Sequence, residues 1–305
     1  MRKKVHIISL RYIIILLLCT AMLIPTLASV YKVDINLDKE TLQELKNYGY
    51  ILYGFRAVES WGPGGRPVVW FATDAYLENT TVCWAENYGA YISTDEPNQG
   101  ADITGRINRP IKLGQIMNVD EDSICTVRSG GRSGYVSIRN KGTHQFTCGI
   151  SDRINNDYFR PICEFVLYGG KTVEIKPVQT ILLVFSTEHL TESTVIDQLL
   201  SPGILIDLEG ADTREVGYDI NEGWNWNNEI WAEEIPAGTA IPSLLVKHPT
   251  ERRIVKGKKS INANTHSHQA SRMTVKPQFF SSFYTVSHEY YGIIYLILNT
   301  SFILT

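Results

Sequence analysis

The sequence lacks the short motifs that carry most known enzyme chemistry. It contains no P-loop, no GxGxxG fingerprint, no GxSxG elbow, no HExxH zinc motif and no CxxC pair. Between residues 30 and 247 there are only two histidines, His144 and His189, and neither has the spacing of a metal-ligand pair. A serine nucleophile would therefore have no obvious base to activate it. We predict no catalytic residue, no metal and no cofactor, which favours a protein that is not an enzyme.

Basic charge is scarce in the central part of the chain. Residues 30–247 hold 18 Lys and Arg against 30 Asp and Glu, a net charge of −12. Such a surface repels the phosphate backbone that dominates nucleic-acid affinity, so nucleic acid is excluded as a partner. The same charge argues against anionic lipid, although membrane contact through aromatic loops stays open.

The N-terminus has the composition of a secretory signal peptide. Four basic residues, the last of them Arg11, accompany an apolar run over 12–24, and small residues stand at Thr26 and Ala28. This pattern predicts a signal over residues 1–28 and export to the extracellular space. An uncleaved anchor helix is the alternative, but the run is shorter than the roughly 20 residues needed to span a bilayer.

Few cysteines remain once that signal is removed. An even number in an oxidising compartment predicts two disulfides, with Cys148–Cys163 and Cys83–Cys125 as the favoured pairs among Cys83, Cys125, Cys148 and Cys163. Asn79-Thr80-Thr81 is an N-glycosylation acceptor, which predicts a surface position for Asn79.

One sequence pattern occurs twice. Leu52-Tyr53-Gly54 and Leu167-Tyr168-Gly169 each precede an apolar run, and the two runs reach Phe71 and Phe185. Further identities recur at an offset of 114, namely Glu78/Glu192, Thr80/Thr194, Gly89/Gly203 and Ile92/Ile206. We interpret the pattern as an internal duplication, with a first β unit over 30–150 and a second over 151–247.

The local patterns predict an all-β fold with one short N-terminal helix. Asp38 can cap that helix and Gly49 can end it. Short runs rich in β-branched and aromatic residues predict strands at 51–58, 66–73, 80–84, 89–93, 111–119, 135–139, 144–150, 191–200, 203–208, 215–220 and 241–247. We expect two antiparallel, sandwich-like units related by a pseudo-twofold axis, or one larger fused sandwich.

Beyond residue 247 the composition changes. Residues 248–278 are basic and polar without periodicity, and residues 279–305 are aliphatic and aromatic with interspersed polar residues. We predict that 248–305 is a disordered or non-native tail. A GPI signal with Ser281-Ser282 as its attachment site, or a membrane-associated segment, are the alternatives.

Tryptophans are the residues most indicative of function. Trp224 and Trp226 would share one face of a strand, near Trp231, Asp219 and Asn221. Flat rings beside amides and carboxylates are what sugar recognition needs, although core packing would also account for the rings. Trp61, within a Gly/Pro loop, is a further candidate contact for a sugar, a membrane or a protein.

Three classes of function follow from these residues. A secreted, lectin-like binding protein that recognises a glycan or another cell-surface ligand is favoured. A secreted effector or toxin that engages membranes through loops such as the one at Trp61 is the second class. An extracellular glycoside hydrolase using two carboxylates, with Glu78 and Glu192 as the pair to test, is the third.

Overall fold

The structure, a computed structural model, describes residues 29–249 except residues 63, 97 and 155–157. All of them lie in one unit of the chain, which ends at Pro249. The predicted signal peptide over 1–28 and the tail beyond Pro249 lie outside the described residues. Within the described part, no helix is both long enough and apolar enough to cross a membrane.

The all-β prediction is confirmed. The elements, in chain order, are β1 (Val30–Asn36), α2 (Lys39–Asn47), β2 (Ile51–Ser60), β3 (Arg66–Pro67), β4 (Phe71–Thr73), β5 (Asn79–Ala85), β6 (Tyr88–Ser93), β7 (Ile107–Ile111), β8 (Gln115–Val119), β9 (Cys125–Ser129), β10 (Val136–Asn140), β11 (Phe146–Arg153), β12 (Phe159–Pro161), β13 (Cys163–Leu167), β14 (Thr172–Ser186), β15 (Gly203–Asp207), β16 (Thr213–Asp219), β17 (Gly223–Asn225), β18 (Ala232–Ile235), α3 (Pro242–Leu245) and β19 (Val246–Lys247).

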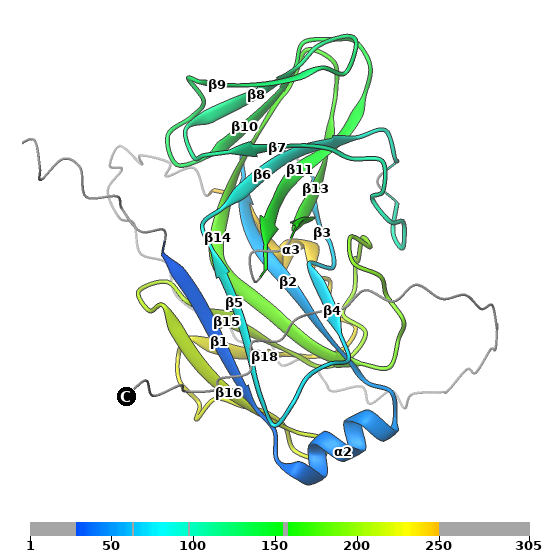
Figure 1. Cartoon of the computed structure of the whole chain (residues 1–305), viewed down its shortest axis with the longest axis vertical. Helices are drawn as coiled ribbons and strands as arrows, with labels where there is room; N and C mark the ends of the chain where they lie inside the picture. The colour runs from blue at the N-terminus through cyan, green and yellow to red at the C-terminus, as the bar shows by residue number, and fades with distance from the viewer. Residues whose placement is uncertain (1–28, 63, 97, 155–157, 250–305) are drawn as a thin grey trace, which may run out of the picture. The chain divides into compact units, whose positions relative to one another are not determined.

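The described strands form three sheets (Figure 1). A four-stranded sheet has the order β17-β16-β1-β5. A nine-stranded sheet has the order β18-β15-β14-β10-β8-β9, and β2 joins it beside β14 together with β4 and β19. A six-stranded sheet has the order β3-β13-β11-β6-β7, with β12 paired to β11. Strand β14 joins the two ends of the nine-stranded sheet, because its first half pairs with β10 and its second half with β15.

The antiparallel pair β2 and β14 forms the centre of the fold. Their register runs from Ile175 opposite Ser60 to Ser186 opposite Ile51, with an irregularity between Pro177 and Ile181. Both strands are buried on both faces over most of this length. Strands covered on both faces have near-continuous apolar sequences instead of alternating ones, which explains the runs over 51–58 and 181–185.

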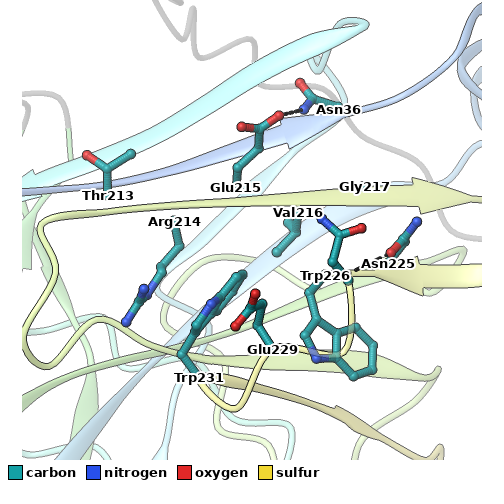
Figure 2. A pocket seen from close by; sticks show the side chains of 11 residues that line it. Asn36, Thr213, Arg214, Glu215, Val216, Gly217, Asn225, Trp226, Glu229 and Trp231 are labelled. Carbon is teal, nitrogen blue, oxygen red and sulfur yellow. Dashed lines mark hydrogen bonds between the residues drawn. The ribbon is translucent and has the colours of Figure 1, made fainter.

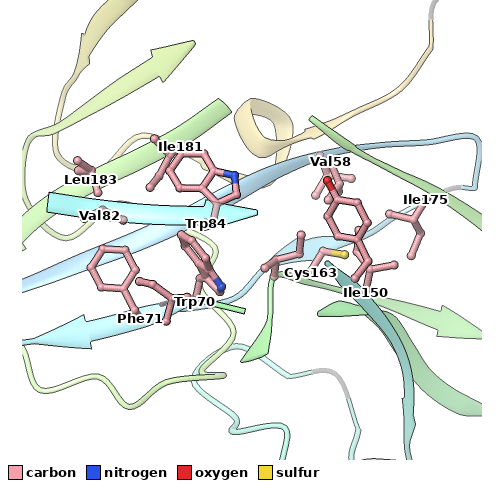
Figure 3. Close-up of a cluster of buried hydrophobic side chains, with 14 of the residues drawn as sticks. Val58, Trp70, Phe71, Val82, Trp84, Ile150, Cys163, Ile175, Ile181 and Leu183 are labelled. Carbon is pink, nitrogen blue, oxygen red and sulfur yellow. The ribbon is translucent and has the colours of Figure 1, made fainter. Parts of the chain in front are cut away.

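Alternate residues of this pair face two separate cores. On one face, Val58, Ile181 and Leu183 pack with Trp70 and Trp84 in the larger cluster (Figure 3). The rings of Trp70 and Trp84 meet edge to face at 5.7 Å, a favourable geometry for aromatic pairs. On the other face, a second cluster contains Tyr53, Phe55, Leu182 and Val184 from the strands and Ile196, Leu199 and Leu245 from the segments that cover them.

A charged group lies inside the larger core. Arg56 of β2 is fully buried and makes a 3.0 Å ion pair with Asp152 of β11, which is equally buried. The guanidinium carbon lies 4.4 Å from the ring of Trp84 and 5.1 Å from that of Trp70. Gln179 accepts a hydrogen bond from Arg56 at 3.2 Å. Burial raises the pKa of Asp152 to about 6, although the Arg56 charge opposes the shift. The pair connects the nine-stranded sheet to the six-stranded one.

The N-terminal helix forms where it was predicted. Asp38 is the N-cap residue, and its carboxylate accepts a 2.7 Å hydrogen bond from the backbone N–H of Thr41. Gly49 follows the helix with φ of 68°, the left-handed conformation that glycine adopts without strain. Leu45 is fully buried, so the helix closes one end of the core.

The internal duplication is not confirmed. Leu52 lies within β2 whereas its counterpart Leu167 ends β13, and Phe71 begins the short β4 whereas Phe185 lies in the long β14. Leu52 and Phe185 even face each other across the pairing of β2 with β14. The predicted boundary between residues 150 and 151 falls inside β11. The two similar segments therefore occupy different elements. The pseudo-twofold axis and the sandwich arrangement are likewise not confirmed.

Two strand predictions were wrong, and those at 66–73 and 111–119 are each interrupted, between β3 and β4 and between β7 and β8. Residues 191–200 form a loop in which Ser193 has φ of 74° and Thr191 donates a 2.7 Å hydrogen bond to Asp102. The backbone groups of this loop bond to several separate segments instead of one neighbouring strand: Ser193 donates to Val69, Val195 to Ala101 and Leu199 to Thr239. Residues 241–247 form the short helix α3 before the two residues of β19, because Pro242 at the first helical position favours a helical turn.

Neither predicted disulfide, Cys83–Cys125 or Cys148–Cys163, is formed among the described residues. Cys83 belongs to β5 of the four-stranded sheet, whereas Cys125 belongs to β9 of the nine-stranded sheet. Cys148 and Cys163 lie on neighbouring strands, but Cys148 pairs with Phe165, so the two thiols are not opposite each other. Burial raises the pKa of both Cys148 and Cys163.

Candidate functional site

The four-stranded sheet has one apolar face and one polar face. In β1, Val33 and Ile35 are fully buried, while the residues between them point the other way. The register places four residues in one row across the polar face, from β5 through β1 and β16 to β17: Asn79, Asn36, Gly217 and Asn225. A Cβ at Gly217 would lie 3.8 Å from the Asn225 side chain, so the glycine keeps the sheet surface open between two amides.

A pocket of about 560 Å³ opens beside β16 (Figure 2). Its sheet wall is formed by Asn36, Thr213, Glu215, Gly217 and Asn225, and its other wall by residues of the loop over 226–231. Among the described strands, β17 pairs only with the last three residues of β16, and β1 covers the opposite edge. The first part of β16 therefore presents an unpaired strand edge to the pocket, and such an edge offers backbone donors and acceptors to a ligand.

The loop over 226–231 has a constrained backbone. Asn227 and Asn228 have φ of 56° and 55°, a conformation uncommon outside glycine and most tolerated by Asn and Asp. The Asn225 side chain accepts a 3.0 Å hydrogen bond from the Asn227 backbone N–H, which fixes the turn. Two successive residues in this conformation turn the chain away from β17. Backbone outliers of this kind concentrate at functional sites.

Two tryptophans of this loop line the pocket. Trp226 and Trp231 are both half-buried, and Figure 2 shows Glu229 between their rings. The backbone carbonyl of Trp231 accepts a 2.8 Å hydrogen bond from the N–H of Asp207, which anchors the end of the loop to β15. Ile230, between the two, is fully exposed at 102%. Single exposed apolar side chains are common on protein surfaces, so Ile230 by itself does not indicate a partner.

Arg214 positions one of the rings. Its guanidinium carbon lies 4.8 Å from the centroid of the Trp231 ring, and its Nε donates a 3.1 Å hydrogen bond to the Asp207 carbonyl. A stacked guanidinium restrains an indole through its charge and its planar shape. One side of Trp231 is therefore covered by protein.

The polar groups of the pocket are amides and carboxylates. The Asn36 side-chain amide donates a 2.6 Å hydrogen bond to Glu215. Glu215 and Glu229 are both exposed. Within the described residues, no group of three or more His, Cys, Asp or Glu side chains could hold a metal ion.

Comparison of the chain with protein-family models, curated proteins and solved structures gave no match. The geometry of this chain alone therefore indicates what the pocket can bind.

The residues predicted from sequence are only partly brought together. Trp231 and Trp226 line the pocket, but Trp224 does not share a surface with them, because β17 ends at Asn225. Trp224 is 5% exposed and stacks on Phe185 at a ring distance of 5.5 Å, inside the larger core.

Asp219 and Asn221 form a turn outside the pocket. The Asp219 carboxylate accepts backbone hydrogen bonds from Glu222 at 2.9 Å and from Asn221 at 2.7 Å, and a 3.2 Å bond from the Thr41 hydroxyl. These bonds lower the pKa of Asp219. Its carboxylate joins the turn between β16 and β17 to helix α2.

Trp61 lies on another surface. It is 41% exposed, its indole N–H donates a 3.1 Å hydrogen bond to the Tyr135 hydroxyl, and the Arg132 guanidinium covers its ring at 4.6 Å. Asn79, the predicted glycosylation site, is exposed at the first residue of β5.

Glu78 and Glu192 occupy different surroundings. The Glu78 backbone carbonyl accepts a hydrogen bond from Leu37 at the end of β1. Glu192 lies in the loop over 191–200, where it pairs with Arg160 at 3.1 Å and accepts a 2.8 Å hydrogen bond from Tyr158.

Sequence reasoning missed Asn36, Arg214, Glu215 and Glu229. The adjacent asparagines Asn227 and Asn228 could have indicated the turn that carries the loop over 226–231, because Asn is the residue most often found in a left-handed conformation after glycine. No local pattern in the sequence could have indicated the contact between Asn36 and Glu215, because it depends on the parallel pairing of β1 with β16, which are far apart in the sequence.

Proposed function

We propose that this protein is a secreted, non-catalytic carbohydrate-binding protein and that the pocket beside β16 is its binding site. Secretion is supported by the basic and apolar composition of residues 1–28. The proposal for the site depends on one observation above all. Two half-buried tryptophans project from a constrained loop into a pocket whose other wall is made of amides and carboxylates.

The chemistry of sugars fits this arrangement. A pyranose ring has an apolar CH face that stacks on an indole and a rim of hydroxyls that need hydrogen-bond partners. Trp226 and Trp231 supply the ring surfaces, while Asn36, Asn225 and Glu215 supply donors and acceptors. A volume of about 560 Å³ lies within the usual range of ligand pockets, about 300–1,000 Å³. It gives room for more than one sugar unit.

The other two classes of function have weaker support. A glycosidase needs two carboxyl groups roughly 5–10 Å apart across the scissile bond. Neither Glu78 nor Glu192, the pair predicted for this role, lines the pocket, and Glu192 is paired with Arg160. The two carboxylates that do line it, Glu215 and Glu229, are both exposed, whereas a general acid needs a carboxyl group withdrawn from water. A membrane-binding effector would use Trp61, but that indole already bonds to Tyr135 and lies under Arg132.

The test is a glycan array followed by calorimetry with the glycans that bind. We expect Trp226→Ala and Trp231→Ala each to weaken binding about tenfold or more, because each removes a stacking surface. Trp61→Ala is the control, since it removes an exposed tryptophan outside the pocket and should leave affinity unchanged. Circular dichroism of each variant reports folding. An array without binding, or unchanged affinity in both pocket variants, would refute the proposal.

A further inference from the structure

Negatively charged side chains outnumber positively charged ones in the pocket. Two carboxylates, Glu215 and Glu229, line it together with one cation, Arg214. Both carboxylates are exposed, so they can reach a ligand. Residues 30–247 also carry a net charge of −12, so the field around the pocket has the same sign.

The cation is turned toward the protein. Arg214 donates through Nε to the Asp207 carbonyl, and its guanidinium carbon lies 4.8 Å from the centroid of the Trp231 ring, so two contacts with the protein hold it. Glu215 receives the Asn36 amide on one oxygen, and its second oxygen adds further acceptor capacity. Figure 2 shows Glu229 extending between the two indoles. A ligand in this position meets carboxylate oxygens and aromatic faces.

We propose that the ligand is a glycan with free amino groups, that is, a polymer or oligomer of 2-amino-2-deoxy sugars in their ammonium form. This inference rests on the proposed function and specifies its ligand class. Ammonium groups of successive sugar units form charge-assisted hydrogen bonds with Glu215 on the sheet wall and with Glu229 on the loop, and the sugar rings stack on Trp226 and Trp231. A cation beside an indole face is also attracted by the ring quadrupole.

The same geometry disfavours other glycans. Acetylation of the amine removes the positive charge and adds bulk, so it forfeits the charge-assisted bonds. A uronic or sialic acid brings a carboxylate toward two carboxylates and is repelled. Neutral sugars keep the stacking and the amide contacts, so their affinity should lie between that of amino sugars and that of acidic sugars.

The experiment compares four oligosaccharides of equal length by calorimetry at pH 6. These are oligomers of glucosamine, N-acetylglucosamine, glucose and galacturonic acid. We expect the glucosamine oligomer to bind about five- to tenfold more tightly than the acetylated one, since exposed charge pairs contribute modestly. Raising the salt from 50 to 500 mM should reduce that advantage, because stacking is not screened and charge pairing is.

Charge-neutral variants locate the effect. The double variant Glu215→Gln/Glu229→Gln should bind the glucosamine and glucose oligomers with nearly equal affinity. The control Glu188→Gln/Glu209→Gln removes two exposed carboxylates outside the pocket and gives the same net charge, so it should keep the preference. If the Glu215→Gln/Glu229→Gln variant still bound the glucosamine oligomer more tightly than the glucose oligomer, the amino-sugar inference would be overturned.

The two proposals fail in different ways. Equal affinity for glucosamine and acetylated oligomers, or tightest binding of the galacturonic acid oligomer, overturns the amino-sugar inference while sugar binding stands. Absence of binding to all four also overturns it, and the glycan array then decides whether sugar binding itself survives.

Discussion

A buried carboxyl group on β13 gives the sharpest test of the fold. Glu164 is 1% exposed, and neither of its side-chain oxygens has a hydrogen-bond partner among the described residues. Arg66 of β3 faces it in the strand register, and Asp197 lies nearby with its own charge. Burial raises the pKa of Glu164 to about 7, with Arg66 opposing the shift and Asp197 adding to it.

This shift makes stability depend on pH in a defined direction. The folded protein binds the Glu164 proton more tightly than the unfolded chain, in which the pKa is near 4.5. The stabilising contribution is therefore complete below pH 4.5 and is lost as the pH rises through about 7. A difference of about 2.5 pH units corresponds to about 3 kcal/mol in the free energy of unfolding.

The variant Glu164→Gln isolates this contribution, because its side chain stays neutral at every pH. We expect the free energy of unfolding of the variant, minus that of the wild type, to increase by about 3 kcal/mol between pH 4.5 and pH 8. Urea unfolding followed by tryptophan fluorescence measures both values by linear extrapolation. Other titrating groups cancel in the difference.

Glu188→Gln serves as the control, since it makes the same substitution at an exposed position away from β13. A pH-independent difference for Glu164→Gln would refute the reasoning, because it would mean that the carboxyl group titrates alike in the folded and unfolded chains.

Three further predictions concern the core and the pocket. Trp224→Ala should lower the free energy of unfolding by about 3–5 kcal/mol in urea titrations, because a buried indole leaves a cavity, whereas an exposed ring would not. Asp152→Ala should cost about 3–5 kcal/mol, because it leaves Arg56 buried without its partner, and the double variant Arg56→Met/Asp152→Leu should recover most of that loss. If Asn79 is glycosylated, Asn79→Gln should change the affinity measured by calorimetry, because Asn79 lies in the same row as Asn36 at the pocket wall; equal affinities would contradict this placement.

Local patterns in the sequence predicted much of the secondary structure. The cap at Asp38 and the glycine at Gly49 bounded helix α2, and β-branched runs marked β2, β5, β6, β10 and β15. These predictions succeeded because capping, turn chemistry and strand preference act over a few neighbouring residues. The predicted strand at 191–200 was wrong because contacts with distant segments, such as Asp102, determine its conformation.

The candidate site was predicted less completely. Aromatic and amide composition pointed to the segment from Trp224 to Trp231, and two of its three tryptophans line the pocket. Alternation along a strand could not separate Trp224 from Trp226, since that separation needs β17 to end between them. The partner residue Asn36 comes from the opposite end of the described residues, and no local pattern links it to Glu215.

The sequence by itself determined the all-β class, the acidic surface, the lack of enzyme motifs and the positions of most strands, because each depends on composition or on neighbouring residues. Only the tertiary structure decided which strands pair, because pairing depends on the fit of side chains that are far apart in the chain. It placed Phe71 and Phe185 on unlike elements, formed neither of the predicted disulfides and buried Arg56 against Asp152. It also built the pocket, since the parallel pairing of β1 with β16 brings the amide of Asn36 to the loop that carries Trp226 and Trp231.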